Sequence, residues 1–473
     1  MFMIAIEATI VSTAMPQVVA QLGGLHLYSW VFSSFLLTQT AVTVVFGKLA
    51  DVYGRKPMIL AGILFFLAGS ILAGFAGSMM TMIVCRLIQG VGAGAIQPIA
   101  MTIVADLYPA RERGKIQGYL ASVWAISALL GPLAGGFIVR DWSWPWIFWI
   151  NVPIGIAAAA GFVLFLHEHE HVRRERRSID VVGAALFAVA VASLLVALTE
   201  AGTSGITVGA VACGLFCVSS VLFIAQERHA ADPMISFALW GHRPIAAANG
   251  VALFASMALM GLTTFLPMYV QGVLHRSPVV AGLALTMMVL GWPAGATLAA
   301  RSFHRVGLRQ ILIAGSVLVP LGSAVFVFLT PESSPLTAGA GSLVMGFGMG
   351  FIGVSSLVLI QELVDWPQRG SATASNVFAR NLGSTLGAAA LGAVLNHGLT
   401  HANHGQSVTS DQLRRLLDAP AGAMSADMSL GAAVQQGLNL TFWAMLAIST
   451  VVVLVALLVP PVPLRQAAES KAA

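Results

Sequence analysis

The chain has 473 residues, of which 58% are hydrophobic and 9% are charged, whereas about 25% of residues are charged in ordinary soluble domains. A soluble protein of this length cannot bury so much apolar surface, but a lipid bilayer covers it. The composition therefore excludes a soluble domain and predicts an all-α, polytopic membrane protein. The net charge of +5 does not indicate a nucleic-acid partner, because the basic residues are spread over loops.

Fourteen apolar runs are long enough to cross the roughly 30 Å of hydrocarbon in a bilayer, and each predicts one transmembrane helix. They lie near residues 2–21, 30–50, 58–77, 79–103, 117–139, 146–166, 180–199, 205–226, 244–270, 279–299, 310–330, 336–361, 376–396 and 437–461. Most connections are short, but a long outer loop is expected at about 397–436.

Basic residues predict the orientation, because lysine and arginine are concentrated on cytoplasmic loops. Only four of the 24 lie on odd-numbered connections, namely Arg140, Arg276, Arg414 and Arg415. Nearly all the others lie on even-numbered connections or in the C-terminal tail. We therefore expect a multi-pass protein of the cytoplasmic (inner) membrane with both termini in the cytoplasm.

Glu7, in the first run, is the only acidic residue placed well inside any apolar run. A charged side chain in hydrocarbon costs roughly 2.5–3.5 kcal/mol on insertion scales, so it is rarely kept for structure alone. Glu7 therefore predicts movement of protons or cations across a membrane. The few residues before it supply about 9 Å of helix, so we expect a native start upstream of Met1, or a truncated first span.

The connection after the second run, residues 47–57, combines glycines with charged side chains. Its glycines permit a tight turn, and its aspartate can accept bonds from helix N-termini or nearby arginines. A basic loop that only sets topology is the alternative, but it would need neither the aspartate nor the glycine spacing. The pattern favours a gating role for Gly47, Asp51, Gly54, Arg55 and Lys56.

The fourth run contains Arg86 and Gln89. An arginine in lipid must face a partner or a water-filled cavity, which favours a functional role for both residues. The alternative is that Arg86 snorkels to the outer surface, about seven residues away. Counted by helical rise from the outer face, Glu7 lies one or two turns deeper than Arg86, so the sequence does not predict that they pair.

The fifth run contains a pattern of small residues and one proline: Gly118, Gly131, Pro132, Gly135 and Gly136. Small residues allow helices to approach closely, and proline kinks a helix. A packing helix with a proline kink is the alternative to a functional motif.

A charged cytoplasmic linker after the sixth run divides the chain into six, two and six runs. We expect an N-terminal six-helix bundle at 1–170, a linker with two inserted transmembrane helices at 171–232, and a C-terminal six-helix bundle at 233–473. Internal similarity supports a repeat, since glycines recur in the fourth and twelfth runs and residues 304–309 echo residues 51–56. Secondary transporters are commonly built from such repeats.

These patterns together resemble the major facilitator superfamily. Residues 47–56 are similar to its signature Gly-x-Leu-Ala-Asp-x-x-Gly-Arg-Lys, and residues 86–90 to its Arg-x-x-Gln-Gly motif, in which the arginine is tied to proton coupling. Residues 118–136 resemble the antiporter motif reported in exporters of the family, with Ser127 in place of one glycine.

The count of fourteen runs resembles the drug:proton antiporter branch of that superfamily. The first run is similar to the branch's pattern, with Glu7 for its Asp and Ser12 for its Asn. Further matches lie at residues 146–155, 266–271, 277–278 and 380–383, although Pro145 stands where Arg is usual. The resemblance covers essentially the whole chain and implies the major facilitator fold, with two six-helix bundles plus two inserted helices.

The expected function is a proton-coupled antiporter that exports lipophilic, cationic or neutral compounds by alternating access between the bundles. Glu7 would carry the proton, with Arg86 and Gln89 beside it, and Asp51 would latch the cytoplasmic gate. No catalytic, metal-ligand or ATP-binding pattern is visible, so we expect no enzyme and no cofactor, with transport driven by the proton gradient. The expected partners are lipophilic small molecules, protons and the bilayer; an outer-membrane efflux assembly is left open.

Three alternatives stay open. A dedicated exporter of one metabolite would use the same machinery on a narrow range of substrates. A proton-symport importer would lack the antiporter pattern of the fifth run. A non-transporting membrane receptor or scaffold would leave Glu7 and Arg86 unexplained, and it would show no proton flux when substrate is added.

Overall fold

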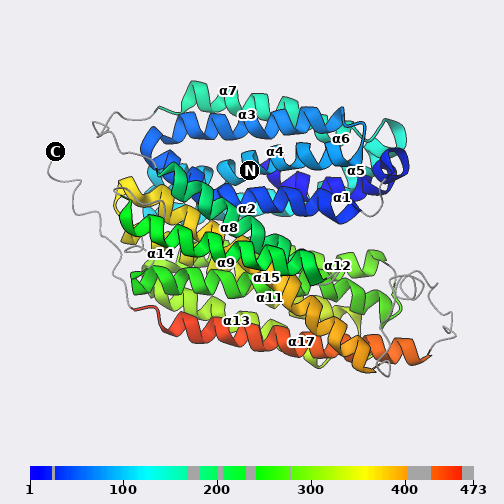
Figure 1. The fold of residues 1–473 in the computed structure, drawn as a ribbon. Helices are drawn as coiled ribbons and strands as arrows, with labels where there is room; N and C mark the ends of the chain where they lie inside the picture. The colour runs from blue at the N-terminus through cyan, green and yellow to red at the C-terminus, as the bar shows by residue number, and fades with distance from the viewer. Residues whose placement is uncertain are drawn as a thin grey trace. The chain divides into compact units, whose positions relative to one another are not determined.

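The computed structural model describes residues 1–23, 27–167, 180–200, 206–230, 241–276, 278–402 and 428–460. These residues are mostly helical, and none of them lies in a strand (Figure 1). Helices suit a bilayer because each backbone N–H and C=O group finds its partner within the same segment, so none is left unsatisfied in lipid.

The helices of the N-terminal half coincide with the first eight apolar runs. They are α1 (Phe2–Leu22), α2 (Tyr28–Tyr53), α3 (Arg55–Gly74), α4 (Met79–Leu107), α5 (Ala110–Asp141), α6 (Trp146–Trp149), α7 (Asn151–Phe165), α8 (Val181–Glu200) and α9 (Ile206–His229). The sixth run is divided into α6 and α7 at Ile150. The break lies near Pro153, which has no N–H to donate to the carbonyl of Trp149.

The helices of the C-terminal half coincide with the remaining six runs. They are α11 (Arg243–Gly272), α12 (Pro278–Val306), α13 (Leu308–Val327), α14 (Pro335–Leu363), the short 3-10 helix η2 (Trp366–Gln368), α15 (Arg369–Ala402) and α17 (Met428–Leu457). Helix thus takes up both ends of the loop predicted at about 397–436, and residues 403–427 lie outside the described part of the chain.

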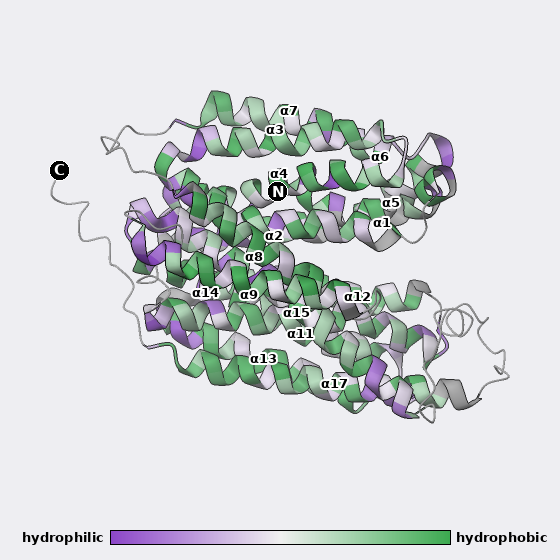
Figure 2. Cartoon of the chain, viewed as in Figure 1, coloured by the Kyte–Doolittle hydropathy of each residue, from purple (hydrophilic) through white to green (hydrophobic). Residues whose placement is uncertain are grey.

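The described helices are those of a multi-pass membrane protein. Ten are long and apolar enough to cross a membrane by length and composition, and two shorter apolar segments lie at Phe2–Val11 and Val182–Ala197. Hydrophobic residues run along the helices, and hydrophilic residues gather near helix ends (Figure 2). The count of fourteen spans stays a prediction.

The chain forms two compact units, each assembled from three stretches. The first contains Met1–Pro109, Tyr119–Trp240 and Leu363–Phe378; the second contains Ala110–Gly118, Gly241–Glu362 and Ala379–Ala473. Helices α8 and α9, which the sequence predicts as inserted helices, belong to the first unit, where they pack on each other and α8 contacts α2. The predicted three-part division of the chain stays a prediction.

The two units share one three-helix arrangement. Gly90 and Gly92 of α4 lie against the backbones of α2 and α3, and Gly346 and Gly348 of α14 lie in the same way against α12 and α13. Small residues at these positions let the helices approach closely, which is how helices associate in lipid. The glycines that recur in the sequence therefore have matching contacts.

The turns before α3 and α13 also match. Gly54 precedes α3 with φ 99° and ψ 156°, and Gly307 precedes α13 with φ 94° and ψ 149°. Both lie in a region that only glycine adopts readily. The sequence echo between residues 51–56 and 304–309 is therefore accompanied by the same backbone turn.

Candidate functional site

Glu7 on α1 and Arg86 on α4 form a buried ion pair in the first unit. Arg86 Nη1 donates to Glu7 Oε1 at 2.5 Å, and the two side chains are 2% (Arg86) and 0% (Glu7) exposed. Two buried apolar clusters flank Glu7, one containing Ile6 and Ile10 and the other containing Met3. In such an apolar surrounding each charge is stabilised by the other, since removing one partner of a buried pair costs roughly 3–5 kcal/mol of stability.

The second oxygen of the carboxylate is bonded to an amide. Asn151, the first residue of α7, donates from Nδ2 to Glu7 Oε2 at 2.7 Å and lies 3.2 Å from Ser70 Oγ on α3. Asn151 is fully buried, and its Oδ1 has no hydrogen-bond partner among the described residues. Both oxygens of Glu7 thus accept bonds, which fits an ionised carboxylate.

Gln89 closes a ring of hydrogen bonds through the four helices α1, α3, α4 and α7. Its Oε1 accepts from Arg86 Nη1 at 2.6 Å, and its Nε2 donates to Ser70 Oγ at 2.9 Å. The ring therefore runs from Glu7 to Arg86, Gln89, Ser70 and Asn151, and back to Glu7. We call these five residues the buried polar ring.

Arg86 is also held by α2. Its Nε donates to the carbonyl oxygen of Val31 at 3.2 Å, and its guanidinium carbon lies 4.3 Å from the ring centroid of Phe35. A cation over an aromatic face is stabilised electrostatically, most strongly when water is excluded. These contacts hold Arg86 inside the first unit, so the alternative of an arginine that snorkels to the outer surface is wrong.

The helical rise counted from the sequence does not predict that Glu7 meets Arg86. That count treats the two helices as parallel and level at their outer ends. It also ignores the reach of arginine, whose flexible stem carries the charged group far from its backbone. The reach of the Arg86 side chain, which the count leaves out, allows its guanidinium group to meet Glu7.

Asp51, near the end of α2, caps the N-terminus of α15 within the first unit. Its Oδ1 accepts from the backbone N–H of Gly370 at 2.9 Å, and its Oδ2 accepts from the N–H and the hydroxyl of Ser371, both at 2.7 Å. The first amides of a helix have no partner within it, and the positive end of the helix dipole favours a carboxylate. Asp51 thereby ties together two segments that are far apart in the sequence.

Arg55, at the start of α3, joins two carboxylates. Its Nη2 lies 2.8 Å from Asp51 Oδ1, and its Nε lies 3.1 Å from Asp106 Oδ2 at the end of α4. Its guanidinium carbon lies 4.5 Å from the ring centroid of Trp366, and Arg369 lies 3.4 Å from Asp106. Two cations and two anions therefore form one compact network where α2, α3, α4 and α15 end or begin.

The other predicted gating residues, Gly47, Gly54 and Lys56, shape the contacts of α2 and α3 with their neighbours. A Cβ on Gly47 would meet the Cβ of Ala374 on α15, so only glycine allows this approach. Gly54 supplies the turn with positive φ. Lys56 Nζ donates to the carbonyl oxygen of Val163, near the end of α7, at 2.9 Å.

The antiporter-like pattern places α5 against α1. A Cβ on Gly131 would meet Thr9 Oγ1, and Thr9 Oγ1 donates to the carbonyl oxygen of Ser127 at 3.2 Å. Ser127, which replaces a glycine of the pattern, thus lies at this contact. A Cβ on Gly136 would meet nothing within 4 Å.

The remaining residues of the pattern differ in their surroundings. Gly118 belongs to the second unit, where a Cβ would lie 3.1 Å from Thr297 Oγ1. Gly135 is buried, and the side chain of Pro132 lies outside the described part of the structure. Gly131 is thus a position where α5 closely approaches α1, a helix of the buried polar ring.

Comparison with known families agrees with this geometry. The family model of the Major Facilitator Superfamily matches residues 1–388. The chain belongs to the Major Facilitator Superfamily.

Three curated relatives match most of this chain, and two of them are named as transporters. The multidrug transporter protein MdtP of Bacillus subtilis (strain 168) is 31% identical over 430 residues, which cover 90% of this chain and 78% of that protein. Multidrug resistance protein 3 of the same strain is 35% identical over 404 residues, covering 84% and 78%. The acurin A biosynthesis cluster MFS-type transporter of Aspergillus aculeatus is 30% identical over 421 residues, covering 87% and 75%.

Two solved structures share the fold. The human organic anion transporter MFSD10 has a TM-score of 0.66 at 15% identity, with 96% of each chain covered. The proton:xylose symporter XylE has a TM-score of 0.62 at 14% identity, covering 97% of this chain and 94% of that one. The chain therefore has the all-α major facilitator fold, and its family and structural neighbours are transporters rather than enzymes.

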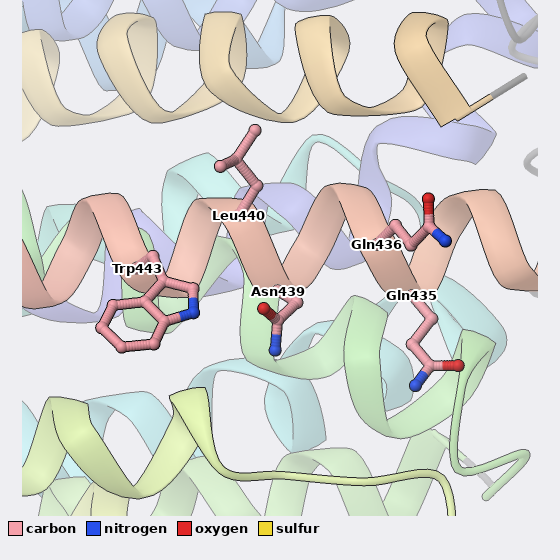
Figure 3. Close-up of a pocket in the computed structure, with 5 residues that line it drawn as sticks. All are labelled: Gln435, Gln436, Asn439, Leu440 and Trp443. Carbon is pink, nitrogen blue, oxygen red and sulfur yellow. The ribbon is translucent and has the colours of Figure 1, made fainter. Parts of the chain in front are cut away.

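A pocket of about 320 Å³ lies along α17 of this superfamily member (Figure 3). It is lined by Gln435, Gln436, Asn439, Leu440 and Trp443. None of the predicted site residues lines it. In the described part of the chain, no group of three or more His, Cys, Asp or Glu side chains is placed to hold a metal ion.

The sequence patterns do not assign Asn151 and Ser70 to the site. Asn151 lies within the matched stretch 146–155, but an amide carries no charge to mark it as costly in lipid. A signal was nevertheless present, because a polar side chain inside an apolar run has to find a hydrogen-bond partner in a neighbouring helix.

Proposed function

We propose that this superfamily member is a proton-coupled antiporter that exports lipophilic compounds by alternating access. The observation that carries the proposal is the buried polar ring, which places a carboxylate and its counter-ion inside the transmembrane helices. Ionisable groups at such positions mark proton and substrate pathways. The names of the relatives, two of them multidrug proteins, support export of drugs or toxic compounds.

Protonation of Glu7 is the proposed coupling step. A protonated Glu7 loses its charge and leaves Arg86 without a counter-ion, so the ring has to rearrange. The protonated oxygen also needs an acceptor, and the unpartnered Oδ1 of Asn151 supplies one if the amide turns over. The ring therefore has a hydrogen-bonding arrangement for each protonation state. Each inward proton gains about 2.3 kcal/mol per 100 mV of membrane potential.

Asp51 is the proposed latch of the cytoplasmic gate. It holds the N-terminus of α15 through three hydrogen bonds and is paired with Arg55. Alternating access requires such contacts to form and break in each cycle. We also propose the cytoplasmic membrane as the location, with both termini in the cytoplasm, because this network and most basic loops would then share one side.

The hydrogen bonds of Glu7 bear on whether the substrate is cationic or neutral. A cation would compete with the proton for the carboxylate of Glu7, but both oxygens of that carboxylate already have donors. A neutral lipophilic compound needs no such competition. We therefore retain neutral compounds in the proposal, and a cation would have to displace Arg86.

A dedicated exporter of one metabolite is the second candidate. The observation that favours it is the relative named for a biosynthesis cluster, which covers 87% of this chain at 30% identity. A panel of chemically unrelated compounds distinguishes the two. A multidrug exporter releases protons with several of them, whereas a dedicated exporter responds to one chemical class.

Proton flux in proteoliposomes tests the proposed function. Purified protein is reconstituted, and proton movement is followed with a pH-sensitive dye on adding ethidium or N-phenyl-1-naphthylamine. Glu7→Gln is expected to abolish the flux while the protein remains folded in the membrane, because the amide cannot carry the proton. Glu332→Gln, an exposed carboxylate between α13 and α14, is the matched control and is expected to match the wild type. An undiminished flux in Glu7→Gln would overturn the assignment.

A further inference from the structure

Arg380 carries a charge in the second unit that no described residue neutralises. It lies on α15, about 16 Å along the helix axis from Arg369 at the helix start. In the described part of the chain it has neither a hydrogen bond nor an ion pair, and its guanidinium carbon lies 5.9 Å from the ring centroid of Trp292 on α12. Both residues belong to the second unit. Arg380 thus differs from Arg86, which has Glu7.

The described part of the second unit offers no carboxylate that pairs with Arg380. Its acidic residues there are Glu112, Glu332 and Glu362, which lie in the first turn of α5, in the loop after α13 and at the end of α14. Glu362 is already bonded to Arg113 at 2.6 Å. The charge of Arg380 is therefore uncompensated within the described part of this unit, and a charge within an apolar run of helix normally faces a partner or a cavity.

The groups around Arg380 are suited to an acceptor from outside the chain. Arg380 is only partly buried as a residue. The next residue, Asn381, has a buried Nδ2 with no hydrogen-bond partner among the described residues. Arginine has only donors, arranged in a planar fork that matches a carboxylate or sulfonate. The donors of both residues are thus unused, and the ring of Trp292 adds an apolar face.

We propose that Arg380 binds the anionic group of the exported compound, while Trp292 packs against its apolar body. The substrate class is then the amphipathic organic anion, a carboxylate or sulfonate on an aromatic or aliphatic body. This inference rests on the proposed export function, because it names a substrate class for that function. An anion that leaves a cytoplasm with a negative potential also moves with the electrical gradient.

Binding of a matched pair of probes to wild-type and variant protein in nanodiscs tests this proposal. The anionic probe is 8-anilinonaphthalene-1-sulfonate, and the neutral probe is N-phenyl-1-naphthylamine, which has the same aromatic body without the sulfonate. Wild-type protein is expected to bind the anionic probe more tightly. Arg380→Gln is expected to weaken anionic binding about tenfold or more and to change neutral binding less than twofold, since a charge-assisted hydrogen bond is lost.

Two further variants sharpen the comparison. Arg380→Lys keeps the charge without the planar fork, so it is expected to retain part of the anionic binding. Arg301→Gln removes the same charge from an exposed position near the end of α12 and is expected to change neither affinity.

Each outcome of these binding measurements either supports or overturns the proposed role of Arg380. An equal loss of both probes in Arg380→Gln would show a structural role and overturn the proposal, as would no loss of either. If Arg380→Gln does not fold, wild-type protein that binds the neutral probe as tightly as the anionic one overturns it. The proton flux driven by the neutral probe, and its loss in Glu7→Gln, are measured separately. Antiport can therefore survive a failure of this inference.

Discussion

At the scale of single residues, Asn151 is the amide through which the buried polar ring can respond to a proton. It donates to Glu7 Oε2 at 2.7 Å, and its own oxygen has no partner in the described part of the structure. Asn151→Ala removes both groups. We expect proton-coupled transport to fall about tenfold and its pH midpoint to move upward, because ionised Glu7 loses a donor. The pH profile of substrate-driven proton flux in proteoliposomes measures both effects.

Ser193 provides the control for that substitution. It is a buried polar residue of α8 whose hydroxyl bonds to carbonyl groups of its own helix. Ser193→Ala is expected to leave the rate and the pH profile unchanged. An Asn151→Ala protein with a lower rate but the native pH midpoint would indicate a packing role only, and it would remove Asn151 from the coupling step.

At the scale of helices, the contact between Asp51 and α15 predicts a kinetic effect. Asp51→Asn keeps one acceptor oxygen but loses the charge that faces Arg55 and the helix dipole. We expect transport to slow about fivefold, which corresponds to about 1 kcal/mol, while substrate affinity changes less than twofold. The measurement compares the initial transport rate and the binding affinity of one compound between the wild-type protein and the variant. Asp141→Asn, at an exposed pair with Arg140, is the control, and a native rate in Asp51→Asn would remove the latch role.

The contact between α5 and α1 predicts a difference between two glycines of the same helix. Gly131→Ala would place a methyl group against Thr9 Oγ1, whereas Gly136→Ala would meet open space. We expect the first to lose about 1–3 kcal/mol of stability through overpacking. The second is expected to be neutral or slightly stabilising, because alanine favours helix over glycine. Thermal unfolding of the purified variants measures the difference. Equal unfolding midpoints for Gly131→Ala and Gly136→Ala would contradict the prediction.

At the scale of the whole molecule, hydropathy predicts where helices lie but not where they end. Each apolar run coincides with helix, because a chain in lipid has to satisfy its backbone internally. The thirteenth run was expected from residue 376, yet α15 begins at Arg369. Polar residues extend the helix past the hydrocarbon, and an apolar window does not detect them. Hydropathy does not predict the cap that Asp51 places on α15, because the cap lies in this polar extension of the helix.

The sequence predicts a side chain of the candidate site most readily where placing that side chain in lipid costs the most free energy. Glu7 and Arg86 stand out in the sequence because a charge is expensive there, but their pairing depends on how the helices pack, which composition does not encode. Asn151 and Ser70 carry no charge and were not assigned. In the sequence Arg380 is only part of a matched pattern, and its lack of a counter-ion among the described residues is seen only when neighbouring helices are placed around it.

The first unit includes residues Leu363–Phe378, which the ribosome makes long after Trp240. A gene cut after Trp240 would therefore yield a half-protein in which Asp51 has neither Gly370 nor Ser371 to accept from. During synthesis these contacts of Asp51 can form only after the start of α15 has been made. Co-expressed fragments cut beyond Phe378 would keep the cap, whereas fragments cut near the middle of the gene would have to restore it by association.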